Sequence, residues 1–337
     1  MPTYVIGDPQ APFAKVLEVL DRHSVLAPGK DRIADGVVLV SIGDHFDYDV
    51  ERPAEAAAEG LRTLRWLASH GPEQVVLLFG NHDAARVMEL AHLDDATFQT
   101  ARALGREIDH VTKTVGSRAG KDREREFFAS YPSLPSSGVI GRDYASFTTE
   151  QRALVIELLL GGRFSLARTC VLDDGRAALL THAGVTNREL GMLGIEFASE
   201  PRLIATTLAQ FFADAIDRVR AAWTNGELAA LSLAPLHVTG SDGEEGGGLL
   251  YHRPTNPASS KIDLRWAANS ERPRRFDPRE LPTGVTQVVG HTGHAKCTHE
   301  LAAWATDAAR ARKRGGIRTL RVTDKSVAYD LDVLAPA

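Results

Sequence analysis

The chain has 337 residues, of which 43% are hydrophobic and 25% charged, and its formal net charge is −5. This composition is typical of a soluble globular protein, and the small negative charge gives no sign of a nucleic-acid or membrane surface. No apolar run approaches the ~20 residues of a membrane helix, and the chain enters its first predicted strand without a signal peptide. Because two cysteines are too few for a disulfide framework, we expect a cytoplasmic protein.

The first part of the chain predicts three strand–turn–helix units in succession. Residues 3–6, 37–42 and 74–79 are apolar runs that predict buried strands. Helices are expected from Pro12 onward and over residues 53–70, because apolar residues there recur at helical spacing. Strands that alternate with helices predict a parallel sheet with right-handed crossovers.

Two later segments interrupt this pattern. Residues 84–160 are highly charged and mostly helical in pattern, and we interpret them as a helical cap inserted between strands of the sheet. Residues 236–282 are a loop-rich insert that we expect near the pocket, since a stretch of that length without regular pattern is usually functional or mobile. Its basic residues Arg272, Arg274 and Arg275 could attract a polyanionic substrate, but we favour the interpretation as a solvated charged loop.

The remaining segments complete what we expect to be a single domain over residues 1–337. A turn at Asp173-Asp174-Gly175 predicts a hairpin between two apolar runs. The expected elements are hairpin strands over residues 165–172 and 176–180, a helix over 201–223, a strand over 285–289, a helix over 298–313, and strands over 317–322 and 326–331.

Several of the expected strands are followed directly by residues that can bind a metal ion. These residues are Asp8 and Gln10, Asp44 and Asp47, Asn81 with His82 and Asp83, His182, and His291 with His294. One such residue is usually a turn or a helix cap, but a repeated set is hard to obtain by chance. Since strands of an open sheet present their carboxyl ends at one edge, we expect a dinuclear metal site there, with Asp44 as the natural bridge.

These strand ends carry motifs in a specific order. They read GDPQ over residues 7–10, GDHFD over 43–47, GNHD over 80–83, THAG over 181–184 and GHT over 290–292. In this order the chain resembles the calcineurin-like metallophosphoesterase superfamily, and most closely its bacterial phosphoprotein-phosphatase-like members. The resemblance implies an α/β (α+β) fold class: two packed mixed β-sheets flanked by helices, a metallophosphoesterase β-sandwich, with the helical cap as an insert.

The resemblance also implies a role for each matched residue. The metal ligands would be Asp8 and Gln10 at a first ion, Asp44 between two ions, and Asn81, His182 and His291 at the second. His82 would protonate the leaving oxygen or stabilise the transition state, and Asp47 would orient its imidazole. Two divalent metal ions are implied; we expect manganese first, with iron, zinc, nickel or cobalt as alternatives.

The sequence departs from the family pattern at two places. Gln10 stands where the family usually has histidine, and His294 is either a replacement ligand or a solvent-facing residue at a helix start. Tyr48 replaces an arginine that grips phosphate in the protein-phosphatase branch. Arg86 and Arg188 are therefore candidates for binding substrate phosphate, and the alternative for each is an ordinary surface arginine.

The expected function is hydrolysis of a phosphomonoester or a nucleotide polyphosphate by attack of a metal-bridging hydroxide. The substrate would be a phosphorylated small molecule or nucleotide, and a phosphoprotein is less favoured because the arginine is missing. No membrane or nucleic-acid partner is expected. One alternative is a phosphodiesterase. Another is a binding scaffold that kept the fold and lost catalysis, for which Gln10 is the one supporting feature.

Overall fold

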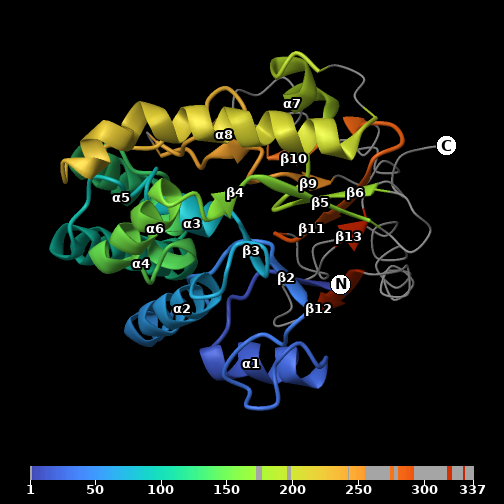
Figure 1. Ribbon diagram of the computed structural model, residues 1–337. Coiled ribbons are helices and arrows are strands. Elements are labelled where there is room, and N and C mark those ends of the chain that lie inside the picture. Colours follow the sequence, from blue (N-terminus) through green and yellow to red (C-terminus); the bar gives the residue numbers. More distant parts are fainter. Residues whose placement is uncertain are drawn as a thin grey trace.

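Two β-sheets form the centre of the molecule, with helices around them (Figure 1). The computed structural model describes residues 2–171, 177–195, 199–241, 243–254, 274–276, 280–291, 317–320 and 329–330. The larger sheet has the order β12 (Ile317–Leu320), β1 (Thr3–Ile6), β2 (Val38–Ser41), β3 (Val75–Leu78), β4 (Phe164–Ser165). The smaller has the order β13 (Tyr329–Asp330), β11 (Thr286–Val289), β6 (Ala177–Thr181), β5 (Ala167–Val171).

The two sheets differ in strand direction. Neighbouring strands of the larger sheet all pair in parallel, as the strand–turn–helix order predicted. The smaller sheet is mixed, because β6 pairs in parallel with β11 but antiparallel with β5, its partner in the predicted hairpin. The expectation of two mixed sheets is therefore correct for the smaller sheet only.

Apolar side chains fill the space between the sheets. Alternate residues of a strand point to opposite faces, so Val40 faces the smaller sheet while Leu39 faces the helices. Side chains from both sheets make up the inner layer: Val5, Val40, Ile42, Val76 and Leu78 from the larger, and Ala178, Leu180 and Val288 from the smaller. This arrangement is the β-sandwich that the motifs implied.

Local signals set where the helices begin. Pro53 and Pro201 stand in the first turns of α2 (Pro53–Ala68) and α8 (Pro201–Thr224), where a missing N–H costs nothing. The bounds of these helices and of α1 (Phe13–Arg22) lie close to those predicted from the sequence. Their apolar faces pack into the main core. No helix among the described residues has the length and apolar character that a membrane span requires.

The predicted cap is divided between two cores. Its helices α4 (Asp95–Thr114) and α5 (Ser117–Ser130), with the π-helix η1 (Val139–Asp143), surround an apolar cluster of their own. The last helix, α6 (Thr149–Leu160), instead packs its apolar side chains into the main core. Sequence periodicity could not separate the two, because it shows that a helix has an apolar face but not which core receives it.

The remaining described elements are short. The segment predicted as a loop-rich insert contains two-residue strands, and two short helices follow strands of the sandwich. They are α3 (Asn81–Ala85), α7 (Asn187–Met192), β7 (His237–Val238), β8 (Gly247–Gly248), β9 (Arg253–Pro254) and β10 (Arg275–Phe276). The helix predicted over residues 298–313 lies outside the described residues.

The carboxyl ends of β2 and β3 lie in backbone contact. Gly43 adopts a φ of +104°, and a Cβ atom there would stand 2.6 Å from the backbone nitrogen of Gly80. A Cβ atom on Gly80 would overlap both the carboxylate and the backbone nitrogen of Asp44. Only glycine fits at these two positions, so the residues that follow each strand are held close together.

Replacing Gly80 tests this constraint. We expect Gly80→Ala to lower the free energy of unfolding by about 1–3 kcal/mol, because the added methyl group must push the two strand ends apart. Gly71→Ala is the control, since a Cβ atom there meets nothing within 4 Å, and it should change stability by less than about 0.5 kcal/mol. Urea unfolding followed by circular dichroism measures both; equal stability of the two variants would contradict the close approach.

Candidate functional site

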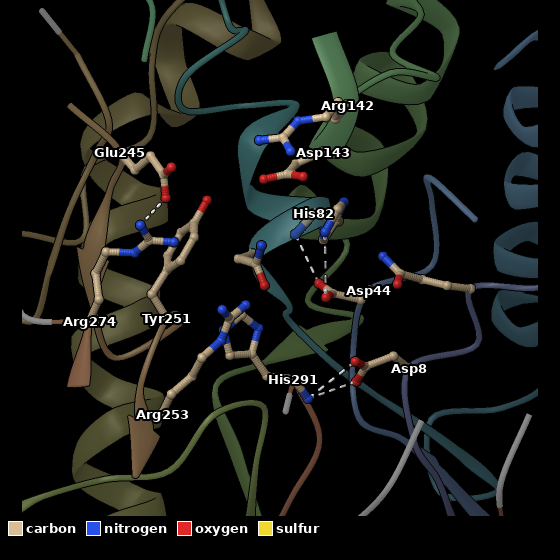
Figure 2. A pocket seen from close by; sticks show the side chains of 12 residues that line it. Asp8, Asp44, His82, Arg142, Asp143, Glu245, Tyr251, Arg253, Arg274 and His291 are labelled. Carbon is tan, nitrogen blue, oxygen red and sulfur yellow. Dashed lines mark hydrogen bonds and ion pairs between the residues drawn. The ribbon is translucent and has the colours of Figure 1, made fainter. Parts of the chain in front are cut away.

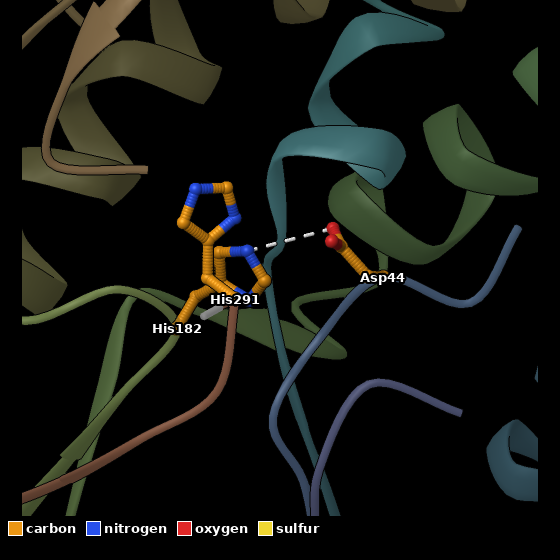
Figure 3. Close-up of side chains that lie close together, drawn as sticks. All are labelled: Asp44, His182 and His291. Atoms are coloured by element: carbon orange, nitrogen blue, oxygen red, sulfur yellow. Dashed lines mark ion pairs between the residues drawn. The ribbon is translucent and has the colours of Figure 1, made fainter. Parts of the chain in front are cut away.

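Three buried side chains converge at the carboxyl ends of β2, β6 and β11 (Figure 3). They are Asp44, His182 and His291, and one ligand atom from each lies within 4.8 Å of the other two. Carboxylate oxygen and imidazole nitrogen are the donors that divalent transition metals prefer in proteins. Segments from three distant parts of the chain therefore form one cluster with the composition of a metal site.

The hydrogen bonding of His182 fixes how its ring faces this cluster. Its Nδ1 lies 2.8 Å from the carbonyl oxygen of Ile42, which can only accept, so Nδ1 carries the proton. Its Nε2 then presents a lone pair 3.0 Å from Oδ1 of Asn81 and 3.5 Å from Oδ1 of Asp44. Acceptor atoms this close repel one another unless a cation lies between them, so this donor set fits a metal ion.

Asp8 and Gln10 continue the cluster on its other side. Asp8 is buried and accepts a hydrogen bond from the backbone nitrogen of His291 at 3.0 Å. Burial, and then the negative charge of Asp44, raise the pKa of Asp8 to about 7. The buried amide nitrogen of Gln10 has no hydrogen-bond partner among the described residues. Two crowded carboxylates fit a divalent cation at the position implied for the first ion, where the carbonyl oxygen of Gln10 would be the further ligand.

Backbone strain coincides with the cluster. Asp44, Asp47 and His291 adopt φ angles of +60°, +68° and +61°, a left-handed region that residues other than glycine enter only uncommonly. Each such residue costs on the order of 1–3 kcal/mol and persists only where surrounding contacts hold it. These contacts therefore position the side chains of the cluster.

His82 stands next to the cluster and is oriented by Asp47. Its Nδ1 lies 2.8 Å from Oδ2 of Asp47, and its Nε2 lies 3.9 Å from Oδ2 of Asp44. Asp47 also accepts hydrogen bonds from the backbone nitrogen and the hydroxyl of Ser146, at 2.8 and 2.6 Å. Burial raises the pKa of Asp47, but Arg86 and His82 outweigh it and hold that pKa well below its usual range. Asp47 is therefore a fixed, charged acceptor beneath the imidazole.

Arg86 and Arg188 do not lie where phosphate binding would place them. Arg86 is 0% exposed, and its Nη1 lies 2.6 Å from Oδ2 of Asp47 and 2.9 Å from the carbonyl of His82. Arg188 pairs with Glu189 at 3.3 Å and does not line the pocket. Arg86 is therefore a structural counter-ion of Asp47. Sequence spacing could not reveal this, because the direction of the Arg86 side chain depends on Asp47, which comes from the loop after β2.

The cluster opens into a pocket of about 290 Å³ that also contains three arginines absent from the predicted site. Figure 2 shows Arg253 and Arg274 on one side of the pocket, facing Asp8 and Asp44 on the other. Both come from the loop-rich insert, whereas Arg142 and Asp143 come from the cap. The interpretation of Arg274 as part of a solvated loop was wrong. The basic run over residues 272–275 was the available signal for it.

The arginines of the pocket have different surroundings. Nε of Arg253 lies 3.2 Å from Nε2 of His291, next to the metal-site cluster. Arg274 forms an ion pair with Glu245, and its guanidinium carbon lies 5.5 Å from the ring centroid of Tyr251. Arg142 donates to the carbonyl of Gly138 and pairs with no described carboxylate. Of the three, Arg253 is the cation closest to the cluster.

A buried contact between a histidine and a carboxylate lies beside Arg253. Nε2 of His252 lies 3.1 Å from Oε1 of Glu189, and the other carboxylate oxygen of Glu189 accepts from the hydroxyl of Thr186 at the start of α7. Burial alone would raise the pKa of Glu189, but the contacts with His252 and Thr186 outweigh burial and lower this pKa to about 2. The pair fixes the insert to the loop after His182.

His294, the remaining predicted ligand, lies outside the described residues.

Arg86→Met tests the structural role of this arginine. Removing the guanidinium leaves the buried carboxylate of Asp47 without its counter-ion, so the free energy of unfolding should fall by about 3–5 kcal/mol. Arg65→Met is the control, because the Arg65–Glu150 pair, with side chains 53% and 60% exposed, is worth less than about 1 kcal/mol. Urea unfolding measures both. A loss at Arg86 no larger than at Arg65 would contradict the assignment.

Comparison with known proteins agrees with the motifs. Residues 1–154 match the family model of calcineurin-like phosphoesterases. A comparison with curated proteins found no match. Among solved structures, the phosphatase domain of the Legionella effector WipB is similar at 14% identity and a TM-score of 0.33, over 68% of this chain and 82% of that one; a likeness this distant does not bear on function. The family match covers residues 1–154 of the 337, and over that part the chain is similar to the calcineurin-like phosphoesterases.

Proposed function

We propose that this protein is a dinuclear metal-dependent phosphomonoesterase that acts on a small phosphorylated molecule. The observation that carries the proposal is the convergence of buried acceptor atoms from Asp44, Asn81, His182 and His291 beside an oriented His82. Asp8 and Gln10 extend the donor set toward the other ion, for which they are the implied ligands. We expect Mn²⁺ first, with Fe, Zn, Ni or Co as alternatives, and the two cysteines agree with a cytoplasmic location.

The metal ions, when bound, would supply positive charge for the phosphoryl oxygens and acidity for an attacking water molecule. The protein's own contribution is the placement of a proton. With Nδ1 fixed by the charged Asp47, His82 directs Nε2 into the pocket, where it can donate a proton to the leaving oxygen. A scaffold without catalysis would have no use for this pair, which favours the enzyme over that alternative.

Arg253 is the residue that we propose binds the substrate phosphate. Its guanidinium lines the pocket beside His291, and the neighbouring contact of His252 with Glu189 fixes its backbone. A guanidinium can give two parallel hydrogen bonds to one phosphoryl group. The position suits a group that grips the oxygens facing away from the metal ions.

The outer pocket favours a phosphomonoester over a nucleotide polyphosphate. The charge of Arg274 is compensated by Glu245, and Asp143 stands next to Arg142. Beyond Arg253 the lining therefore carries little net positive charge, whereas a polyphosphate chain would need several additional cations. The pocket volume of about 290 Å³ also suits a small leaving group better than a dinucleotide.

His82→Asn tests the proposed chemistry. Wild-type protein loaded with Mn²⁺ should hydrolyse nitrophenyl phosphate faster than bis-nitrophenyl phosphate or diadenosine tetraphosphate, and chelation should abolish turnover. The variant should lower kcat about 10²–10⁴-fold while retaining its metal, because only the proton donor is removed. His110→Asn, on an exposed face of α4, is the control. Wild-type preference for the diester would support the phosphodiesterase instead, and full activity of His82→Asn would refute its assigned role.

Arg253→Met separates phosphate binding from chemistry. The loss of a charge-assisted interaction should raise KM for nitrophenyl phosphate and the inhibition constant of inorganic phosphate by about 10- to 100-fold. Arg188→Met, which removes an arginine outside the pocket lining, should leave both constants close to wild type. Steady-state kinetics with phosphate as the inhibitor measures the difference. If the two variants behaved alike, phosphate would have to be held by another group.

A further inference from the structure

A buried serine, histidine and aspartate lie in a hydrogen-bonded row directly beneath the candidate metal site. Oγ of Ser41 lies 2.9 Å from Nε2 of His45, and Nδ1 of His45 lies 3.0 Å from both carboxylate oxygens of Asp83. All three residues are at most 1% exposed. The order resembles that of a nucleophilic triad, but no substrate can reach the buried hydroxyl, which leaves the row a structural role.

Each donor in the row has one fitting acceptor. The ionised carboxylate of Asp83 can only accept, so the proton of His45 sits on Nδ1. Nε2 then accepts the hydrogen of the Ser41 hydroxyl. A fully satisfied buried network of this kind has one arrangement, and any change in it leaves a polar group unpaired. The row therefore fixes the position of Asp83 relative to β2.

Asp83 in turn connects the two strand ends that carry metal ligands. Its Oδ2 accepts from the backbone nitrogens of Asp44 and Gly80, each at 3.0 Å, and its Oδ1 accepts from the backbone nitrogen of His45 at 3.2 Å. Capping of α3 accounts only for the bond from Asp83 to the backbone nitrogen of Gly80. The bond to the backbone nitrogen of Asp44 holds that residue at a φ of +60°. Asp83 therefore sets the direction of the Asp44 carboxylate.

We propose that Ser41, His45 and Asp83 form a positioning relay that sets the geometry of the metal site. The relay aligns Asp44, the bridging candidate, with Asn81 at the start of α3. None of its members touches the pocket, so they act through the ligands and are not catalytic residues. The proposal rests on the proposed metal-dependent function, and its observable consequence is the affinity of the protein for divalent ions.

The variants remove different bonds of the row. His45→Phe removes both bonds of the imidazole, whereas His45→Asn retains a donor near Nδ1 for Asp83 and loses only the link to Ser41. Ser41→Ala removes a single hydroxyl and is the variant least able to disturb folding. Thr63→Val is the matched control, because Thr63 is equally buried in α2 and its hydroxyl has no partner among the described residues.

The measurement is calorimetric titration of each metal-free protein with Mn²⁺, beside urea unfolding and nitrophenyl phosphate kinetics. We expect His45→Phe to weaken Mn²⁺ binding about 10- to 100-fold and to lower kcat with little change in KM. His45→Asn should recover most of both, Ser41→Ala should show a smaller loss in the same direction, and Thr63→Val should match wild type.

Two results would count against specific claims. If Ser41→Ala and His45→Phe unfold more easily yet bind Mn²⁺ with wild-type affinity and turn over at wild-type kcat, the row only stabilises the fold and the relay is refuted. If wild type binds Mn²⁺ but hydrolyses no phosphoester, the proposed function fails, and the titrations of the variants still decide the relay. If His45→Phe does not fold, Ser41→Ala and His45→Asn carry the test.

Discussion

The close approach of Gly43 and Gly80 is the constraint on which the site depends. With no side chain at either position, the ends of β2 and β3 meet backbone to backbone, and the residues that follow each glycine reach the same volume. Asp83 then links the two strand ends, because its carboxylate accepts a hydrogen bond from a backbone N–H group of each. The bond from Asp83 to the backbone nitrogen of Asp44 offsets part of the free-energy cost of the left-handed backbone at Asp44. This strained backbone conformation fixes the direction of the Asp44 carboxylate.

The buried carboxylates of the site have two different kinds of surroundings. The negative charge of Asp47 is balanced by the neighbouring side chains of Arg86 and His82, so Asp47 stays charged. Among the described residues no arginine or lysine pairs with Asp8 or Asp44, and the pKa of Asp8 is raised to about 7. Burying charge without compensation is costly, so the contrast marks where an external cation belongs. It also separates the group that orients His82 from the groups that would bind metal.

The metal-site cluster and the outer pocket come from different parts of the chain. The metal-site cluster comes from strand ends of the sandwich, whereas the outer pocket is lined by the cap, through Arg142 and Asp143, and by the loop-rich insert, through Arg253 and Arg274. Inserts of this kind can change a pocket without disturbing the strand ends beneath it. The little net charge of this outer lining is the reason that we favour a monoester of a small alcohol.

The sequence alone determined the strands of the sandwich and the polar residues at their ends, because buried strands are apolar runs and their ends follow motifs that local chemistry requires. It therefore predicted which residues gather at the metal-site cluster. Tertiary structure decided the direction and burial of long side chains: Arg86, one turn from the motif, is a counter-ion inside the protein, while Arg253, from an insert without a motif, faces the pocket. It also decided that His45 is part of a buried row and that α6 belongs to the main core. The physical reason is the same in each case: hydrogen-bond partners and packing surfaces come from residues distant in sequence, and periodicity and spacing describe only neighbours.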